Sequence, residues 1–319
     1  MTLTFMPKGQ DSAVAYLFPG QGAQAVGMGR ELYNESPAAR AIFDEVDEAL
    51  GRSLTDTLFN GPEDELRQTV NAQPAIMAVS LACIKAMEEK LGAEAMPHPV
   101  LMAGHSLGEY TALTAAGVLT VSETAYLVSV RSRLMQVACD QNPGTMAAII
   151  GLDEMPLEEI ARETGTYVSN VNTAEQIVIS GERIAVAQAL DLASARGAKK
   201  VVPLRVGGAF HSSLMEPAKV GLLDAINSLA FREPTIPIVA NCTGEPLTTA
   251  DAIKQELVSQ ICACVQWKRS IDYMVDKGVS RFIEIGPGRA LTGMVKRISR
   301  DAKVVNVADI ESILSLHRN

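Results

Sequence analysis

The segment with the clearest chemical potential is residues 104–108, GHSLG, which has the G-x-S-x-G spacing of a nucleophile elbow. An apolar run over residues 100–103 precedes it, and an Ala/Leu-rich run over residues 107–116 follows it. This context predicts a buried strand, a tight turn and a helix, with the Ser106 hydroxyl at the tip of the turn. The first N–H groups of the helix, including that of Leu107, should face any oxygen that becomes negative there. We expect Ser106 to be a nucleophile, and a purely structural glycine-flanked turn is the alternative.

A serine hydroxyl needs a neighbouring base at neutral pH, and histidine is the usual base. The chain contains four histidines: His98, His105, His211 and His317. His98 precedes the predicted strand at the end opposite the turn, and His317 is third from the C-terminus. His105 should point away from Ser106 across the turn. His211 follows another predicted strand, where open α/β sheets place their ligands, so we expect it to be the base. A loop histidine without a role is the alternative.

Two kinds of group could orient His211. An aspartate is the usual choice in hydrolases, and Asp140, Asp153 and Asp191 lie between Ser106 and His211 in the chain. The last two, however, fall in a segment that we predict to form a separate small domain. A backbone carbonyl or a side-chain amide is the other choice, and the sequence leaves both open.

Two further segments offer groups for binding a substrate. Arg131 and Arg133 lie in a predicted helix, where a guanidinium facing the site would bind a carboxylate through two hydrogen bonds. A pair of exposed arginines is the alternative. The glycine-rich segment 19–24 lacks the Lys-Ser/Thr pair of a phosphate loop. It either brings a backbone N–H or the Gln21 side chain beside the reacting group, or it is a plain strand-to-helix turn.

The predicted elements describe an α/β protein with two domains. Strands alternate with helices in most of the chain, which indicates a mainly parallel sheet covered on both faces. Between residues 143 and 207 the order becomes β-α-β-β-α-β, which is typical of a ferredoxin-like domain. We therefore predict a large domain of residues 1–142 and 208–319 with a ferredoxin-like small domain, residues 143–207, inserted in it. In the large domain, Pro74 should lie in the first turn of its helix, and another helix should start at Ser122, whose hydroxyl can cap it.

The composition narrows the class of function. Of the 319 residues, 47% are hydrophobic, which is enough for one large core and a smaller one, and the net charge of −9 argues against binding to nucleic acids or anionic membranes. The five cysteines show no disulfide framework, and the pair Cys262 and Cys264 has no histidine nearby, so we expect free thiols and no metal site. The longest apolar stretches, such as residues 75–84, fall well short of the ~20 residues that span a bilayer. With no signal peptide pattern, we expect a cytoplasmic protein.

Five motifs together resemble the malonyl-CoA:acyl-carrier-protein transacylases of bacterial fatty acid synthesis and their near relatives in polyketide synthesis. In order along residues 13–300, the motifs are FPGQGAQ (18–24), GHSLGE (104–109), GAFHS (208–212), VQW (265–267) and EIGPG (284–288). Ala23 departs from the serine that the family often has in the first motif. The resemblance implies an α/β-hydrolase-like large domain and an inserted ferredoxin-like domain.

The resemblance also implies roles for the residues of the reaction centre. Ser106 would be the acylated nucleophile, and His211 would be its base. Gln266 would present its backbone carbonyl to His211 in place of the acid of a triad. The backbone N–H groups of Gln21 and Leu107 would form the oxyanion hole.

For the substrate, the resemblance favours Arg131 over Arg133 as the residue that binds the malonyl carboxylate. Phe210 resembles the malonyl-selective members of the family, and Asn172 would line the cleft. The implied activity is transfer of malonyl from malonyl-CoA to the phosphopantetheine thiol of an acyl carrier protein, through a malonyl-serine intermediate, without a metal or cofactor.

The implied partners are malonyl-CoA and an acidic, phosphopantetheine-bearing carrier protein, acting with a monomeric enzyme. The carrier protein would dock on basic residues, with candidates Lys199, Lys200, Arg289 and Lys296. We favour fatty acid synthesis; a discrete acyltransferase that serves a polyketide synthase in trans is the alternative. A serine esterase or thioesterase, or an inactive scaffolding homologue, would be a different class of protein.

Overall fold

Two β-sheets with packed helices make up the part of the chain that the computed structural model describes, residues 13–92 and 94–316. Neighbouring strands of the larger sheet are parallel except for its last pair, β7 and β8. In spatial order this sheet consists of β10 (Lys303–Val307), β9 (Val279–Ile285), β1 (Ala13–Phe18), β2 (Pro99–Gly104), β7 (Ile238–Val239) and β8 (Pro246–Leu247). The prediction of a mainly parallel sheet is thus confirmed.

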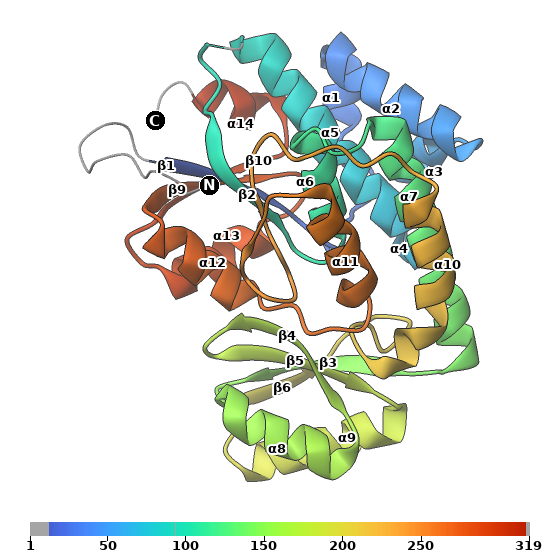
Figure 1. The fold of residues 1–319 in the computed structure, drawn as a ribbon, viewed down its shortest axis with the longest axis vertical. Helices are drawn as coiled ribbons and strands as arrows, with labels where there is room; N and C mark the ends of the chain where they lie inside the picture. The colour runs from blue at the N-terminus through green and yellow to red at the C-terminus, as the bar shows by residue number, and fades with distance from the viewer. Residues whose placement is uncertain (1–12, 93, 317–319) are drawn as a thin grey trace.

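Helices cover both faces of this sheet (Figure 1). Side chains of β1 alternate between the two faces, so that Val14, Tyr16 and Phe18 belong to one hydrophobic core and Ala15 and Leu17 to the other. The second core is completed by α12 (Trp267–Asp276) and α13 (Ala290–Ile298). The first core is completed by α1 (Arg30–Glu35), α2 (Pro37–Leu50), α3 (Leu54–Asn60), α4 (Glu63–Arg67), α5 (Thr69–Leu91), α6 (Leu107–Ala115), α7 (Val121–Gln141), the 3₁₀ turn η1 (Ser213–Met215), α10 (Glu216–Asn227), α11 (Ala250–Gln260) and α14 (Ile310–Ser315).

The smaller sheet is antiparallel and has a hydrophobic core of its own. It consists, in spatial order, of β4 (Tyr167–Thr173), β5 (Gln176–Gly181), β3 (Thr145–Ile150) and β6 (Lys200–Pro203). The helices α8 (Glu154–Thr164) and α9 (Arg183–Ala195) lie on the face that is turned away from the larger sheet (Figure 1). Along the chain the order is β-α-β-β-α-β, as predicted. The edge strand β4 is covered by Val265, whose backbone N–H and C=O bond to Ser169 and Val171 at 2.8 and 2.9 Å.

Two helix starts differ from the sequence prediction. Helix α5 begins at Thr69, so Pro74 lies inside it rather than in its first turn. Proline cannot donate to the carbonyl of Val70, and Arg52 Nη2 donates to this carbonyl instead, at 3.1 Å. Helix α7 is capped by Thr120, not by Ser122, because Thr120 forms a capping box with Glu123.

The 23-residue helix α5 also corrects the expectation about apolar stretches. By length and composition alone, Thr69–Leu91 is apolar enough to cross a membrane. In this fold 83% of its most apolar window is buried inside the protein, where α5 packs between α2 and α7. The helix is therefore accounted for as a core helix.

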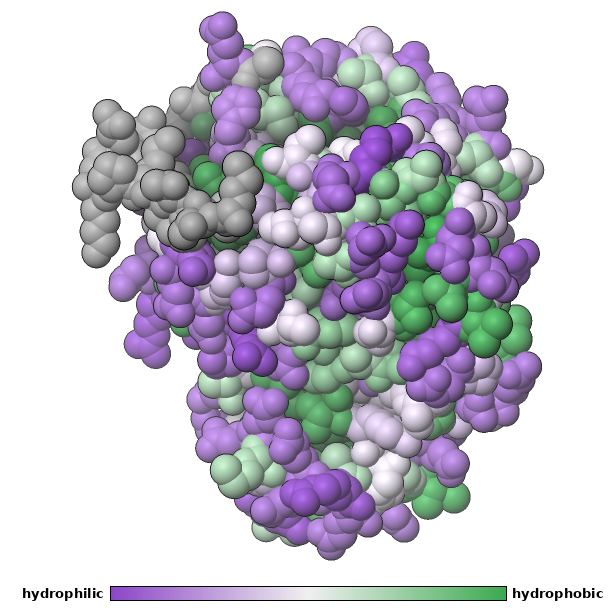
Figure 2. Space-filling view, viewed as in Figure 1, coloured by the Kyte–Doolittle hydropathy of each residue, from purple (hydrophilic) through white to green (hydrophobic). Residues whose placement is uncertain are grey.

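Most of the molecular face in Figure 2 is hydrophilic. The hydrophobic side chains that reach this face gather mainly along its right edge, over α7 and α10, helices that expose Val137, Val220 and Leu223. The predicted docking residues Lys199, Lys200, Arg289 and Lys296 are exposed on other elements.

Candidate active site

The G-x-S-x-G segment forms the predicted turn between β2 and α6. Ser106 stands at the tip of this turn with a φ of 51°, a left-handed value that is rare for a residue with a side chain. The flanking glycines allow a close approach of backbones. A Cβ on Gly104 would lie 2.0 Å from the carbonyl oxygen of Gly108, and a Cβ on Gly108 would lie 2.0 Å from that of Phe18. The turn is thus pressed against the end of β1, and Ser106 is lifted to the carboxyl edge of the parallel sheet.

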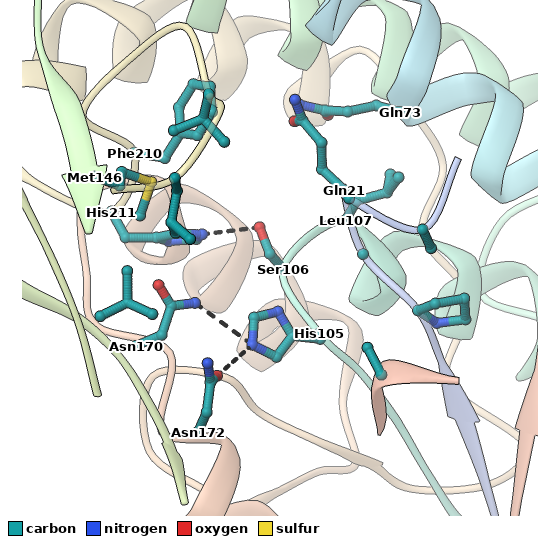
Figure 3. Close-up of a pocket in the computed structure, with 18 of the residues that line it drawn as sticks. Gln21, Gln73, His105, Ser106, Leu107, Met146, Asn170, Asn172, Phe210 and His211 are labelled. Atoms are coloured by element: carbon teal, nitrogen blue, oxygen red, sulfur yellow. Dashed lines mark hydrogen bonds between the residues drawn. The ribbon is translucent and has the colours of Figure 1, made fainter. Parts of the chain in front are cut away.

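Ser106 and His211 are brought together from positions 105 residues apart. Ser106 Oγ lies 2.8 Å from His211 Nε2 (Figure 3). On the other side of the ring, His211 Nδ1 lies 2.9 Å from the backbone carbonyl oxygen of Gln260 and 3.2 Å from that of Ala263. Because carbonyl oxygens only accept hydrogen bonds, Nδ1 carries the hydrogen and Nε2 is free to accept the hydroxyl proton.

The carbonyl predicted to orient His211 was assigned to the wrong residue. Gln266 lies just before α12, and its carbonyl accepts hydrogen bonds from Ser270 inside that helix. Gln260 is the last residue of α11, where the final carbonyls of a helix have no intrahelical donor. The free carbonyl at this helix end meets His211, and none of the three candidate aspartates is needed.

The electrostatic surroundings keep His211 neutral. Burial is the larger cause and the positive charge of Arg131 the next, and together they lower the pKa of His211 to about 3. A neutral imidazole at pH 7 is the form that can remove a proton from Ser106.

Arg131 is buried, with 1% of its surface exposed, and it contacts Ser106. Its Nη2 donates to Ser106 Oγ at 3.1 Å and to Gln260 Oε1 at 3.0 Å, and its Nη1 donates to Gln73 Oε1 at 2.6 Å. The guanidinium also lies over the ring of Tyr110, 5.0 Å from its centre. Among the described residues no carboxylate forms an ion pair with Arg131, and its buried Nε has no hydrogen-bond partner. An anionic ligand would supply the direct ion pair that Arg131 lacks.

These groups line one cavity of about 260 Å³ between the two sheets. Ser106, His211 and Arg131 face it from the larger part of the molecule. The other predicted residues Gln21, Leu107, Phe210 and Asn172 line it as well, whereas Arg133 is exposed elsewhere. Leu107 begins α6, so its N–H has no acceptor within the helix.

His105 was predicted to point away from Ser106, and its ring is directed to the smaller sheet (Figure 3). It nevertheless lines the cavity. Its Nε2 lies 2.9 Å from Asn172 Oδ1 and 3.4 Å from Asn170 Nδ2. Burial lowers the pKa of His105, so this ring is a neutral part of the cavity wall. His98 is exposed before β2, and His317 lies outside the described residues.

Sequence reasoning missed three amides of the site, those of Gln73, Gln260 and Asn241. Gln73 and Gln260 both contact Arg131, and Asn241 Oδ1 accepts from the Ser106 N–H at 2.7 Å. No spacing rule marks these residues. The only available signal is that Gln73 adjoins Pro74 at the buried end of an apolar helix.

The basic docking candidates differ in their surroundings. Lys199 forms an ion pair with Glu175 at 3.1 Å on the surface of the smaller sheet. Arg289 directly precedes Ala290, which lines the cavity, so Arg289 lies close to its opening. The five cysteines are free, and among the described residues no group of His, Cys, Asp and Glu side chains could hold a metal ion.

Comparison with known proteins identifies the family. The model of the acyl transferase domain family matches residues 15–319. The chain is 41% identical over 307 residues to the malonyl CoA-acyl carrier protein transacylase of Bacillus subtilis (strain 168), covering 95% of each protein. It is 36% identical over 313 residues to the protein of the same name from Staphylococcus aureus (strain MRSA252), covering 97% of this chain and 99% of that one. The chain belongs to the malonyl-CoA:acyl carrier protein transacylase family.

Solved structures of this transacylase family have the same fold. The acyl-carrier-protein-S-malonyltransferase from Bartonella henselae superimposes with a TM-score of 0.92 at 42% identity, covering 96% of this chain and 98% of that one. A malonyl-transacylase solved in complex with its type II PKS acyl-carrier protein gives a TM-score of 0.92 at 37% identity, covering 97% of this chain and 100% of the other. The family predicted from five motifs is confirmed, and the chain is an acyltransferase.

Proposed function

We propose that this acyltransferase moves a malonyl group from malonyl-CoA to the phosphopantetheine thiol of an acyl carrier protein by a two-step Ser-His mechanism. The observation that carries the proposal is the convergence of two groups on one atom. Ser106 Oγ lies 2.8 Å from a neutral histidine and 3.1 Å from a buried guanidinium without a carboxylate partner. The first group activates the hydroxyl, and the second selects an acyl group that carries a negative charge.

In the first step the Ser106 hydroxyl attacks the thioester carbonyl, and His211 Nε2 takes the hydroxyl proton. The carbonyl oxygen becomes negative and is held by the backbone N–H groups of Gln21 and Leu107. The C–S bond then breaks, and His211 gives its proton to the departing CoA sulfur. The product is a malonyl ester of Ser106 together with free CoA.

In the second step the carrier protein thiol follows the same route in reverse. Its proton passes to His211 Nε2 as the sulfur attacks the ester carbonyl. The C–O bond to Ser106 breaks, and His211 returns the proton to the serine oxygen. The carbonyls of Gln260 and Ala263 hold His211 in the same tautomer through both steps.

Arg131 binds the malonyl carboxylate through its guanidinium. This contact holds the malonyl ester in place until the carrier protein thiol attacks it. Phe210 and Asn172 form part of the cavity wall around the malonyl group. All these roles are filled by protein groups, so the mechanism that we propose needs no cofactor.

We also propose a pathway, a docking surface, a location and a domain organisation for the enzyme. We infer fatty acid synthesis as the pathway; the polyketide alternative is supported by a structural relative that serves a type II PKS. The carrier protein would dock at the exposed basic residues Lys199, Lys200, Arg289 and Lys296 of a monomeric enzyme. Free thiols are consistent with the cytoplasm as its location. We class the larger part as α/β-hydrolase-like and residues 143–207 as an inserted ferredoxin-like domain, because this segment encloses a separate core.

The two half-reactions test the proposal. The enzyme is incubated with malonyl-CoA, freed of CoA by desalting, and divided between buffer and phosphopantetheine-bearing carrier protein. We expect the malonyl group to remain on the enzyme in buffer and to move to the carrier thiol when the carrier is present. Rapid release of malonate in buffer would instead indicate a thioesterase, and failure to load at all would indicate an inactive homologue.

A further inference from the structure

Glu109 is a fully buried carboxylate directly beneath the elbow, and the proposed proton transfers do not use it. It lies in α6, three residues after Ser106. Its Oε1 accepts hydrogen bonds from the backbone N–H and Nδ2 of Asn241 at 2.8 and 3.1 Å. Its Oε2 accepts from Gln260 Nε2 at 2.6 Å. Three donors from two distant segments therefore converge on one side chain.

Gln260 connects this carboxylate to the reacting groups. Its backbone carbonyl accepts from His211, its Nε2 donates also to the backbone carbonyl of Ser106 at 2.9 Å, and its Oε1 accepts from Arg131. The ionised carboxylate of Glu109 and the Ser106 carbonyl can only accept, and the guanidinium can only donate. The Gln260 amide therefore satisfies all its partners in one orientation, with its oxygen turned to Arg131.

Asn241 makes a similar set of hydrogen bonds between Glu109 and the elbow. Its Nδ2 donates to Glu109 and, at 2.7 Å, to the carbonyl of Gly104, and its Oδ1 accepts from the N–H of Ser106. Two amides thus turn their NH₂ groups to Glu109 and their oxygens to the site. A second buried carboxylate, Glu256, accepts from the N–H of Cys242 at 2.8 Å and has no hydrogen bond to Gln260.

We propose that Glu109 is a positioning residue, which holds the Gln260 amide oxygen toward Arg131 and so aims the guanidinium at the carboxylate of the acyl group. This inference rests on the proposed malonyl transfer. Glu109 touches neither the substrate nor the reacting atoms, and it acts through Gln260. Burial raises the pKa of Glu109, and so does the charge of Glu256; the hydrogen bonds from Asn241 and Gln260 and the charge of Arg131 oppose this rise.

The substitution Glu109→Gln tests the role with almost no change of shape. The glutamine side chain of this variant has one oxygen. Because two donors of Asn241 converge on Oε1, we expect the oxygen to occupy the Oε1 position. The NH₂ group of the substituted side chain then faces the NH₂ group of Gln260, and neither can accept a hydrogen bond from the other. Gln260 must turn away, and Arg131 Nη2 loses the Gln260 oxygen as an acceptor.

The measurement is the acylation of the enzyme by malonyl-CoA and by acetyl-CoA, expressed as the ratio of their kcat/KM values. Glu109→Gln should lower the malonyl-to-acetyl ratio about tenfold or more, because a hydrogen bond to a charged group is lost. In an Arg131→Ala background the same substitution should change the ratio by less than about twofold, because its effect passes through Arg131. A role in folding alone would lower both acylation rates equally in both backgrounds, and that result would overturn the inference.

Glu284→Gln is the matched control. Glu284 is equally buried, but its carboxylate accepts from the N–H groups of Leu291 and Thr292 at the start of α13. We expect a lower melting temperature with an unchanged acyl ratio.

If Glu109→Gln does not fold, Gln260→Ala tests the same link, because it keeps the backbone carbonyl for His211 and removes the amide. It should lower the acyl ratio to a similar extent, and an unchanged ratio would refute the inference. A wild-type enzyme without preference for malonyl, or an Arg131→Ala variant that keeps the preference, would refute the proposed function itself. A ratio that falls in Arg131→Ala but not in Glu109→Gln or Gln260→Ala would refute only the positioning role.

Discussion

The two walls of the cavity are lined by different kinds of side chain. The wall from the larger part of the molecule holds Ser106, His211 and Arg131, linked to one another and to buried amides by hydrogen bonds. The wall from the smaller sheet consists of apolar and amide side chains such as Met146, Asn172 and Val178. The groups that could carry charge or move a proton thus lie on one wall, while the other wall shapes the cavity with uncharged side chains.

The two histidines that line the cavity, His105 and His211, differ most clearly in their expected roles. His211→Ala should lower the rate of malonyl transfer by at least about 10⁴-fold, because the base of the serine is lost. His105→Ala removes a ring that contacts the smaller wall and should have a far smaller effect. Steady-state kinetics with carrier protein measures both. Equal losses in the two variants would break the contrast.

Substitutions of Arg131 on one wall and Met146 on the other test which wall selects the substrate. Arg131→Ala should lower kcat/KM for malonyl-CoA about 10²-fold and improve tolerance of uncharged acyl groups, since a buried charge partner of the carboxylate is removed. Met146→Ala should change malonyl and acetyl transfer alike, because it alters only the space. Competition between the two acyl-CoA substrates measures the selectivity, and retained malonyl preference in Arg131→Ala would favour an esterase.

The pH dependence of acylation tests the electrostatics of the reactive wall. A protonated His211 cannot accept the serine proton, so the rate should fall as pH falls through the pKa of His211. With that pKa at about 3, the rate should stay constant through the ordinary histidine pKa of about 6.5. Removing the positive charge in Arg131→Ala should raise the pKa and move the decline to higher pH. Acetyl-CoA as donor avoids the change in carboxylate binding, and a wild-type decline centred near an ordinary histidine pKa would contradict this account.

The smallest expected effects concern docking of the carrier protein. Charge reversal at Lys199 and Lys200, on the smaller sheet, or at Arg289, beside the cavity opening, should raise the carrier KM several-fold and leave loading from malonyl-CoA unchanged. Because Lys199 already pairs with Glu175, we expect the larger increase for Arg289. Unchanged carrier KM values in both variants would remove these residues from the docking surface.

The pairing of Ser106 with His211 could be predicted from the sequence for physical reasons. The elbow requires glycines at fixed positions, and four histidines left few choices for the base. Arg131 was preferred to Arg133 only through the family resemblance, because helical spacing does not show which arginine is buried. Gln260 was missed because a backbone carbonyl at a helix end has no side-chain signature. Pro74 was placed too near its helix start because the compensating bond from Arg52 comes from another segment.

The most direct test of the central claim is the covalent intermediate on Ser106. Intact-mass analysis after incubation with malonyl-CoA should show one malonyl adduct on the wild-type protein, located by peptide mapping on the segment 104–108. The account predicts that this adduct is absent from a folded Ser106→Ala variant. An adduct of equal amount on Ser106→Ala, or its location on another residue, would contradict the account.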